Sequence, residues 1–269
     1  MMGLFLTTLA AAAIQTAAPA PAPTPATAPP VQPIRASKIV LVGDSTTAVA
    51  GGWGGAFCAD HVTSFVACVN LARGGRSSGS YIAEGSWALA LAEMKTRGFV
   101  RTWVLIQFGH NDQPGKPGRS TDLATEFPAN LRRYVTETRA AGAIPVLVTP
   151  LTRRTFVDGK LVEDLAPWAQ SVRAVARAMN VPLVDLNAGS TAAVNAMGEA
   201  EADGFAQLPK GSTPTGGVAG EVNDNPFAQR RLAFDRTHLG RKGADYFATM
   251  VARELASAVP DARPLLFDQ

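Results

Sequence analysis

The stretch KIVLVGDSTTA, residues 38–48, sets a run of Val, Ile and Leu directly before a glycine, a carboxylate and hydroxyl groups. A run that is apolar at successive positions is expected of a strand buried on both faces of a parallel sheet. The residues Gly43-Asp44-Ser45-Thr46 are also common in ordinary turns, where Asp and Ser bond their own backbone. The alternative interpretation is that a strand end presents Ser45 as a nucleophile while Asp44 braces the turn.

Further short apolar runs alternate with helical patterns along the chain. The predicted strands are 38–43, 65–71, 102–108, 144–149 and 181–185. The predicted helices are 52–61, 83–97, 127–141, 164–179, 188–198 and 240–257. This alternation predicts a three-layer α/β/α sandwich around a parallel sheet, with ligands bound outside the carboxyl ends of the strands. The Gly/Pro-rich segment 199–233 is long for a connection, so we expect an excursion near the site.

Composition divides the 269 residues into four predicted parts. Residues 1–18 are apolar and then rich in small residues, which is typical of a secretory signal peptide, and 19–36 form a Pro/Ala-rich linker. Residues 37–260 form the folded domain and 261–269 a C-terminal tail. We therefore expect a secreted or periplasmic protein without stable membrane insertion once the signal is removed; an uncleaved or lipid-linked start is the alternative.

Charge and cysteine content limit the function classes. The formal charge is +3 and no Lys/Arg-dense run occurs, so the sequence gives no support for nucleic-acid binding. Cys58 and Cys68 lie ten residues apart and, in an exported protein, favour one disulfide over two buried thiols. Two cysteines and three histidines are few for a zinc-ligand cluster.

Polar residues follow the predicted strands and point to acyl transfer through a serine. A serine hydroxyl becomes nucleophilic when a histidine takes its proton, and a carboxylate must hold that histidine in the right tautomer. Ser45 follows the first strand, while Asp235 and His238 stand three residues apart before the last helix. We therefore predict Ser45 as the nucleophile, His238 as the base and Asp235 as its partner.

The tetrahedral intermediate of such a reaction needs hydrogen-bond donors for its oxyanion. Candidates are the backbone N–H groups of Ser45 and Gly75 and the side-chain amide of Asn111, each after a different predicted strand. An ordinary turn at Gly75 and a loop-bracing role for Asn111 are the structural alternatives.

Two rival sites compete with this interpretation. Residues 75–79, GRSSG, match the G-x-S-x-G nucleophile elbow around Ser77, but they follow only the second strand. A metal-dependent phosphoesterase would use carboxylates and histidines as ligands. Its candidate ligands are Asp44, His110, Asp112, Asp235 and His238.

Six sequence blocks in order resemble the SGNH hydrolases, also called GDSL-like esterases, and within them the rhamnogalacturonan acetylesterases. The blocks are residues 43–46 (GDST), 52–54 (GWG), 70–77 (NLARGGRS), 108–112 (FGHND), 149–154 (TPLTRR) and 235–238 (DRTH). The resemblance spans roughly residues 38–257. It implies a flavodoxin-like sheet of five parallel strands, the roles given above for Ser45, His238 and Asp235, and no metal or organic cofactor.

The resemblance further implies removal of O-acetyl groups from pectin, an acidic polysaccharide. Guanidinium groups form strong paired hydrogen bonds with carboxylates. Arg76, Arg153 and Arg154 are therefore candidate substrate-binding residues. Bracing of loops is the alternative for at least half of the arginines near the site. Trp53 is a candidate for stacking on a sugar, with packing against the sheet as its alternative. An esterase for xylan, for a surface glycan or for small acyl esters, and a glycan-binding pseudoenzyme, remain open.

Overall fold

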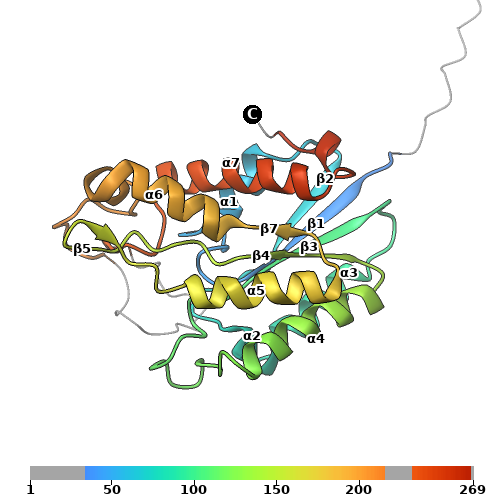
Figure 1. Ribbon diagram of the computed structural model, residues 1–269. Helices are drawn as coiled ribbons and strands as arrows, with labels where there is room; N and C mark the ends of the chain where they lie inside the picture. The colour runs from blue at the N-terminus through green and yellow to red at the C-terminus, as the bar shows by residue number, and fades with distance from the viewer. Residues whose placement is uncertain (1–33, 216–231, 268–269) are drawn as a thin grey trace, which may run out of the picture. The chain divides into compact units, whose positions relative to one another are not determined.

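Five parallel strands form the central sheet, in the order β2-β1-β3-β4-β7 (Figure 1). Their bounds are β1 Ser37–Gly43, β2 Val66–Asn70, β3 Thr102–Gln107, β4 Ile144–Val148 and β7 Leu183–Val184. The computed structural model describes residues 34–215 and 232–267. The predicted signal peptide, 1–18, and the predicted linker through residue 33 lie outside these ranges.

The strands bury side chains on both faces, as their continuous apolar runs predict. In β1, Ile39 and Leu41 belong to one hydrophobic cluster, whereas Val40 and Val42 belong to the other. All four are fully buried, because successive side chains of a strand point to opposite faces. Two cores therefore lie on either side of a single sheet.

Helices cover both faces of the sheet and confirm the predicted α/β/α sandwich (Figure 1). The helices α1 (Gly54–Asp60), α6 (Leu186–Asp203) and α7 (Arg241–Ala258) pack on one face. The other face carries α2 (Ser78–Ala83), α3 (Ser86–Met94), α4 (Glu126–Ala140) and α5 (Ala166–Met179). Among the described residues, no helix combines the length and the apolar character needed to cross a membrane.

Local backbone chemistry explains most departures from the predicted elements. The predicted helix 83–97 corresponds to α3, which begins only after Gly85, a residue with a positive φ of 88°; the short helix α2 before it was not predicted. A hairpin of β5 (Phe156–Val157) and β6 (Lys160–Leu161) was not predicted. Its turn residues, Asp158 and Gly159, have φ of 49° and 73°, as an Asp-Gly hairpin turn requires.

The segment predicted as an excursion, 199–233, is described only in part. Its first residues continue α6 to Asp203, beyond a kink at Gly198 with φ 74°. Thr215 and Leu232 then pair in an antiparallel bridge, which brings the chain back three residues before Asp235. Residues 216–231 lie outside the described ranges.

The predicted C-terminal tail, 261–269, is part of the folded domain at least as far as Phe267, so the boundary at residue 260 is too early. Ala262 and Leu266 are buried in the hydrophobic cluster that also contains the apolar residues of α7. Leu266 forms a bridge with Val62, and the Phe267 N–H donates to the His61 carbonyl over 3.0 Å. A short 3-10 helix, Arg263–Leu265, makes this return possible.

A disulfide joins Cys58 of α1 to Cys68 of the edge strand β2. These are the chain's two cysteines. We predict that the double variant Cys58→Ala/Cys68→Ala loses about 2–3 kcal/mol in the free energy of unfolding, because the unfolded chain is no longer cross-linked. Thermal unfolding with and without a thiol reductant measures this. The reductant should lower the Tm of the wild type and leave that of the variant unchanged; an equal response in both would contradict the prediction.

Candidate active site

Ser45, His238 and Asp235 form a hydrogen-bonded chain at the carboxyl edge of the sheet. The Ser45 Oγ lies 2.9 Å from Nε2 of His238, and the His238 Nδ1 lies 3.0 Å from Oδ2 of Asp235. Ser45 follows β1 directly, whereas the other two residues precede α7. The side chains of His238 and Asp235 are 37% and 38% exposed, so substrate has access to the imidazole.

Asp235 also organises its own turn. Its Oδ1 accepts hydrogen bonds from the backbone N–H groups of Thr237, at 2.8 Å, and His238, at 2.6 Å. Partial burial by itself raises the pKa of Asp235, but the hydrogen bonds and charge of His238, with the backbone donors, lower it below its usual value. The carboxylate is therefore ionised when it faces the imidazole, and it can stabilise a positive charge there.

Arg154 is completely buried. Its side chain supports the backbone of the turn that carries Asp235 and His238. Its Nη2 donates to the carbonyls of Asp235 (3.1 Å) and His238 (2.8 Å), and its Nη1 to that of Thr237 (3.4 Å). Its backbone N–H donates to the Arg236 carbonyl over 2.8 Å. Burial lowers the pKa of Arg154 to about 10, which leaves the guanidinium charged at neutral pH. The prediction that Arg154 binds substrate is wrong, since the side chain does not reach the surface.

Trp53 does not meet the substrate either, because it is fully buried. Its indole Nε1 donates to Oε1 of Gln107 over 2.9 Å, and the Gln107 Nε2 donates to the Thr46 hydroxyl over 2.6 Å. The predicted stacking of Trp53 on a sugar is therefore wrong. The tryptophan instead anchors the turn that follows Ser45.

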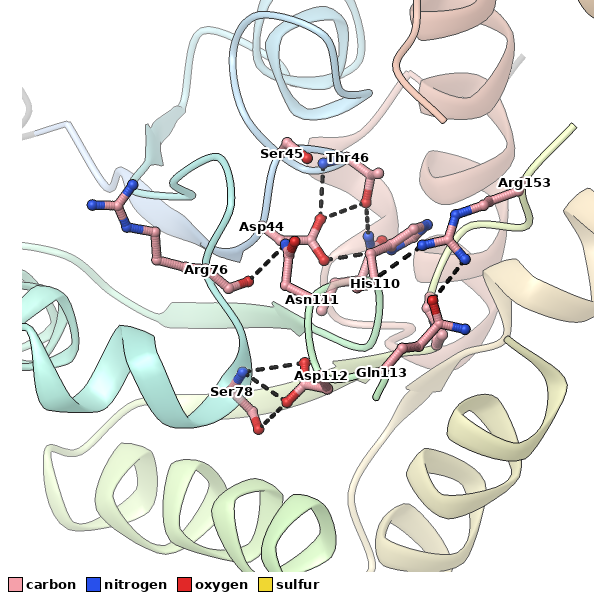
Figure 2. Close-up of polar contacts among 12 residues, drawn as sticks. Asp44, Ser45, Thr46, Arg76, Ser78, His110, Asn111, Asp112, Gln113 and Arg153 are labelled. Carbon is pink, nitrogen blue, oxygen red and sulfur yellow. Dashed lines mark hydrogen bonds and ion pairs between the residues drawn. The ribbon is translucent and has the colours of Figure 1, made fainter. Parts of the chain in front are cut away.

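Asp44 completes the support of this turn (Figure 2). Its Oδ1 accepts from the N–H and the hydroxyl of Thr46, at 2.8 and 2.7 Å, and its Oδ2 lies 3.4 Å from Nδ1 of His110. Burial alone raises the pKa of Asp44, but the neighbouring imidazole and the Thr46 hydrogen bonds lower it below its usual value. Asp44 thus braces the turn through backbone hydrogen bonds, as the sequence predicts.

The loops that carry Gly75 and Asn111 are joined to each other beside Ser45. A Cβ added to Gly74 would lie 3.6 Å from that of Ser45, and Gly75 adopts a positive φ of 78°. The Asn111 Nδ2 donates to the Arg76 carbonyl over 3.1 Å (Figure 2). Within the described part of the chain, neither the Ser45 N–H nor the Gly75 N–H donates a hydrogen bond. Two backbone donors are thus available next to the hydroxyl.

Asp112 joins the same two loops from below (Figure 2). Its Oδ1 accepts from the N–H of Ser78 at 3.0 Å, from the Ser78 hydroxyl at 2.6 Å and from the Thr121 hydroxyl at 2.9 Å. Burial raises the pKa of Asp112 to about 6, although these hydrogen bonds oppose the shift. Asp112 is therefore a loop-bracing carboxylate rather than a group that faces solvent.

The other two candidate substrate-binding arginines are held by protein groups. Arg76 is 7% exposed and donates to Glu84 at 2.8 Å and to the Gly74 carbonyl at 2.9 Å. Arg153 pairs with Asp164, donates to Oε1 of Gln113 over 2.8 Å, and contacts the His110 carbonyl. Arg153 keeps a side-chain exposure of 15%, so its outer edge alone faces solvent.

The rival sites are not assembled. Ser77 is fully buried, and its hydroxyl caps α2 by accepting from the Ser80 N–H. Over residues 34–215 and 232–267, no group of three or more His, Cys, Asp or Glu side chains is placed to hold a metal ion. The carboxylates of Asp44 and Asp112 are instead occupied by Thr46, Ser78 and Thr121.

Sequence reasoning missed one residue that supports Ser45 and assigned another to the wrong role. Gln107 was missed, and Arg154 was assigned to the substrate, whereas both act on the site through buried polar contacts. Gln107, a polar residue in the otherwise apolar run 102–108, was the available signal, because a buried amide needs partners.

Comparisons with known proteins agree with this geometry. The model of the GDSL-like Lipase/Acylhydrolase family matches residues 41–246. The "Probable rhamnogalacturonan acetylesterase YesY" of Bacillus subtilis (strain 168) is 30% identical over 225 residues, covering 81% of this chain and 92% of its own length. The "Rhamnogalacturonan acetylesterase RhgT" of the same strain is 33% identical over 223 residues, covering 80% of this chain and 88% of its own.

Solved structures agree on the fold. An X-ray structure of another Bacillus subtilis protein superposes with a TM-score of 0.62 at 23% identity, over 84% of this chain and 58% of that chain. At this identity the likeness concerns the fold alone.

We predict that Arg154→Met lowers kcat for p-nitrophenyl acetate by about 10²-fold, because the turn that carries the imidazole loses its buried donors and shifts. KM should change little, since Arg154 does not touch substrate, and Arg154→Lys should recover part of the loss. The matched control is Arg139→Met, which also removes an arginine that donates to two backbone carbonyls, those of Met179 and Asn180. If Arg154→Met folds and keeps the wild-type kcat, the assigned support of the turn is wrong.

Proposed function

Since the chain belongs to the GDSL-like lipase/acylhydrolase family, we propose that it is a serine esterase that removes O-acetyl groups from an acetylated polysaccharide, with pectic rhamnogalacturonan as the substrate. The observation that carries the reaction type is the 2.9 Å contact of Ser45 with a histidine that also faces a carboxylate. The two relatives named rhamnogalacturonan acetylesterases support the substrate.

The reaction follows from the proton path along this chain. His238 Nε2 takes the proton of the Ser45 hydroxyl as its Oγ attacks the acetyl carbonyl carbon, and Asp235 stabilises the resulting imidazolium. The C–O bond to the sugar then breaks, and His238 gives the proton to the leaving sugar oxygen. Water, activated by the same imidazole, hydrolyses the acetyl-serine and releases acetate.

The oxyanion of each tetrahedral intermediate is assigned to three donors. These are the N–H groups of Ser45 and Gly75, which have no acceptor within the described chain, and the side-chain amide of Asn111. The loop contacts made by Asp112 and Arg76 keep these donors in place before substrate arrives. Donors fixed in advance need no reorganisation during the reaction, which is what makes them effective.

We also propose that the protein is exported to the periplasm or beyond the cell. The apolar start of the sequence supports a signal peptide, although residues 1–33 lie outside the described ranges. The Cys58–Cys68 disulfide supports an oxidising compartment. Both observations suit an enzyme whose substrate is a polymer.

We predict that Ser45→Ala lowers acetate release from acetylated rhamnogalacturonan by more than about 10³-fold, because the nucleophile is lost. Acetate is measured with acetylated rhamnogalacturonan, acetylated xylan and p-nitrophenyl acetate. The control is Ser77→Ala, which costs the α2 cap about 1 kcal/mol and should keep activity. Serine-dependent release mainly from the pectic polymer supports the proposal, whereas release mainly from xylan assigns a different glycan. Binding of the pectic polymer with no release from any ester would indicate a pseudoenzyme.

A further inference from the structure

The loop of residues 113–121, sequence QPGKPGRST, lies beside the candidate active site and carries two cations, Lys116 and Arg119. The loop is compact, because the Ser120 hydroxyl donates to the Gln113 carbonyl over 2.8 Å and accepts from the Lys116 N–H over 2.9 Å. Its two ends are held together, since the Thr121 N–H donates to the carbonyl of Asp112, the residue before the loop, over 2.9 Å. Both cationic side chains therefore project from a defined position.

Each cation contacts the backbone carbonyl of a residue in a loop that packs beside Ser45. Lys116 Nζ donates to the His110 carbonyl over 2.6 Å, and the His110 ring faces Asp44, the residue before the serine. Arg119 Nη1 lies 3.5 Å from the Gly75 carbonyl, in the loop whose Gly74 abuts Ser45. The two charges thus border the side of the site that holds the oxyanion donors.

Within residues 34–215 and 232–267, Lys116 and Arg119 form no ion pair. The other arginines at this edge have acidic partners: Arg73 and Arg76 face Glu84, and Arg153 faces Asp164. Partial burial and the charges of Arg153 and Arg119 lower the pKa of Lys116, although the charges of Asp44 and Asp164 oppose the shift. Gathering like charges without an ion-pair partner costs free energy, and an anionic ligand would offset that cost.

We propose that Lys116 and Arg119 form a subsite for the carboxylate of a uronic acid of the acetylated polysaccharide. The inference rests on the proposed function and names the feature of the substrate that this site selects. Arg119 offers a planar fork that suits a carboxylate, and Lys116 adds a compact charge. Both side chains are partly exposed, unlike the buried Arg154 and Arg76. The contact with the carboxylate fixes the position of the polysaccharide along the site, so that its acetyl group lies at the Ser45 hydroxyl.

The first experiment compares the double variant Lys116→Gln/Arg119→Gln with the wild type on acetylated rhamnogalacturonan, on acetylated xylan free of uronic acid and on p-nitrophenyl acetate. We expect KM for the acidic polymer to rise about 20-fold, because two charge-assisted contacts at a partly exposed site are lost. The kcat/KM for the two uncharged substrates should stay within about twofold of the wild type. Equal losses on all three substrates would mean that the two residues only brace the loop, which overturns the proposal.

A second experiment does not depend on turnover of the pectic polymer. Oligogalacturonate should inhibit hydrolysis of p-nitrophenyl acetate by the wild type, more weakly in high salt, and its inhibition constant should rise about 20-fold in the double variant. The control Lys95→Gln/Arg132→Gln changes the net charge equally at exposed positions away from the site. Oligogalacturonate should inhibit this control as strongly as it inhibits the wild type. Oligogalacturonate that inhibits both double variants and the wild type equally would overturn the subsite.

The two experiments separate failure of the subsite from failure of the proposed function. If rhamnogalacturonan is not deacetylated while oligogalacturonate inhibition depends on Lys116 and Arg119, the substrate is another uronate-containing glycan and the subsite stands. If rhamnogalacturonan is deacetylated equally well by the wild type and the double variant, the proposed function stands and the subsite falls.

Discussion

The buried guanidinium of Arg154 is the contact on which the candidate site depends. It reaches from the chain that follows β4 to three carbonyls of the turn that carries Asp235 and His238. A charged donor without a carboxylate partner is costly to bury unless it is hydrogen-bonded, so the guanidinium and the turn stabilise each other. The base is thereby held 2.9 Å from a serine located 193 residues earlier in the chain.

Other buried polar residues support the turn after Ser45 in the same way, through hydrogen bonds. Trp53, Gln107 and Thr46 form a continuous line of hydrogen bonds under the turn, and Asp44 binds the same threonine from the other side. These four buried polar side chains fix the backbone close to the serine. Lys116 and Arg119, which form no ion pair within the described chain, stand partly exposed beside the site.

Much of the fold was predictable from the sequence because burial on both faces of a parallel sheet leaves a local pattern. The runs around Val40, Val104 and Val146 identify their strands without tertiary information. The helix α2 was not predicted, because its six residues are too few to show a helical period; the Asp158-Gly159 turn carried a signal that went unused. The same three side chains that the sequence pattern groups, Ser45, Asp235 and His238, are those that the structure connects by hydrogen bonds. The roles of Trp53 and Arg154 were mistaken, because exposure of a side chain depends on distant elements that no local pattern reports.

The separation of Ser45 from His238 along the chain has a consequence for biogenesis. The nucleophile leaves the first strand, but its base stands directly before α7, and the segment after α7 returns to pair with Val62. The hydrogen bond between Ser45 and His238 closes a loop of 193 residues, and closing so long a loop costs entropy. A chain that has not yet been synthesised as far as residue 238 therefore holds its serine without a base.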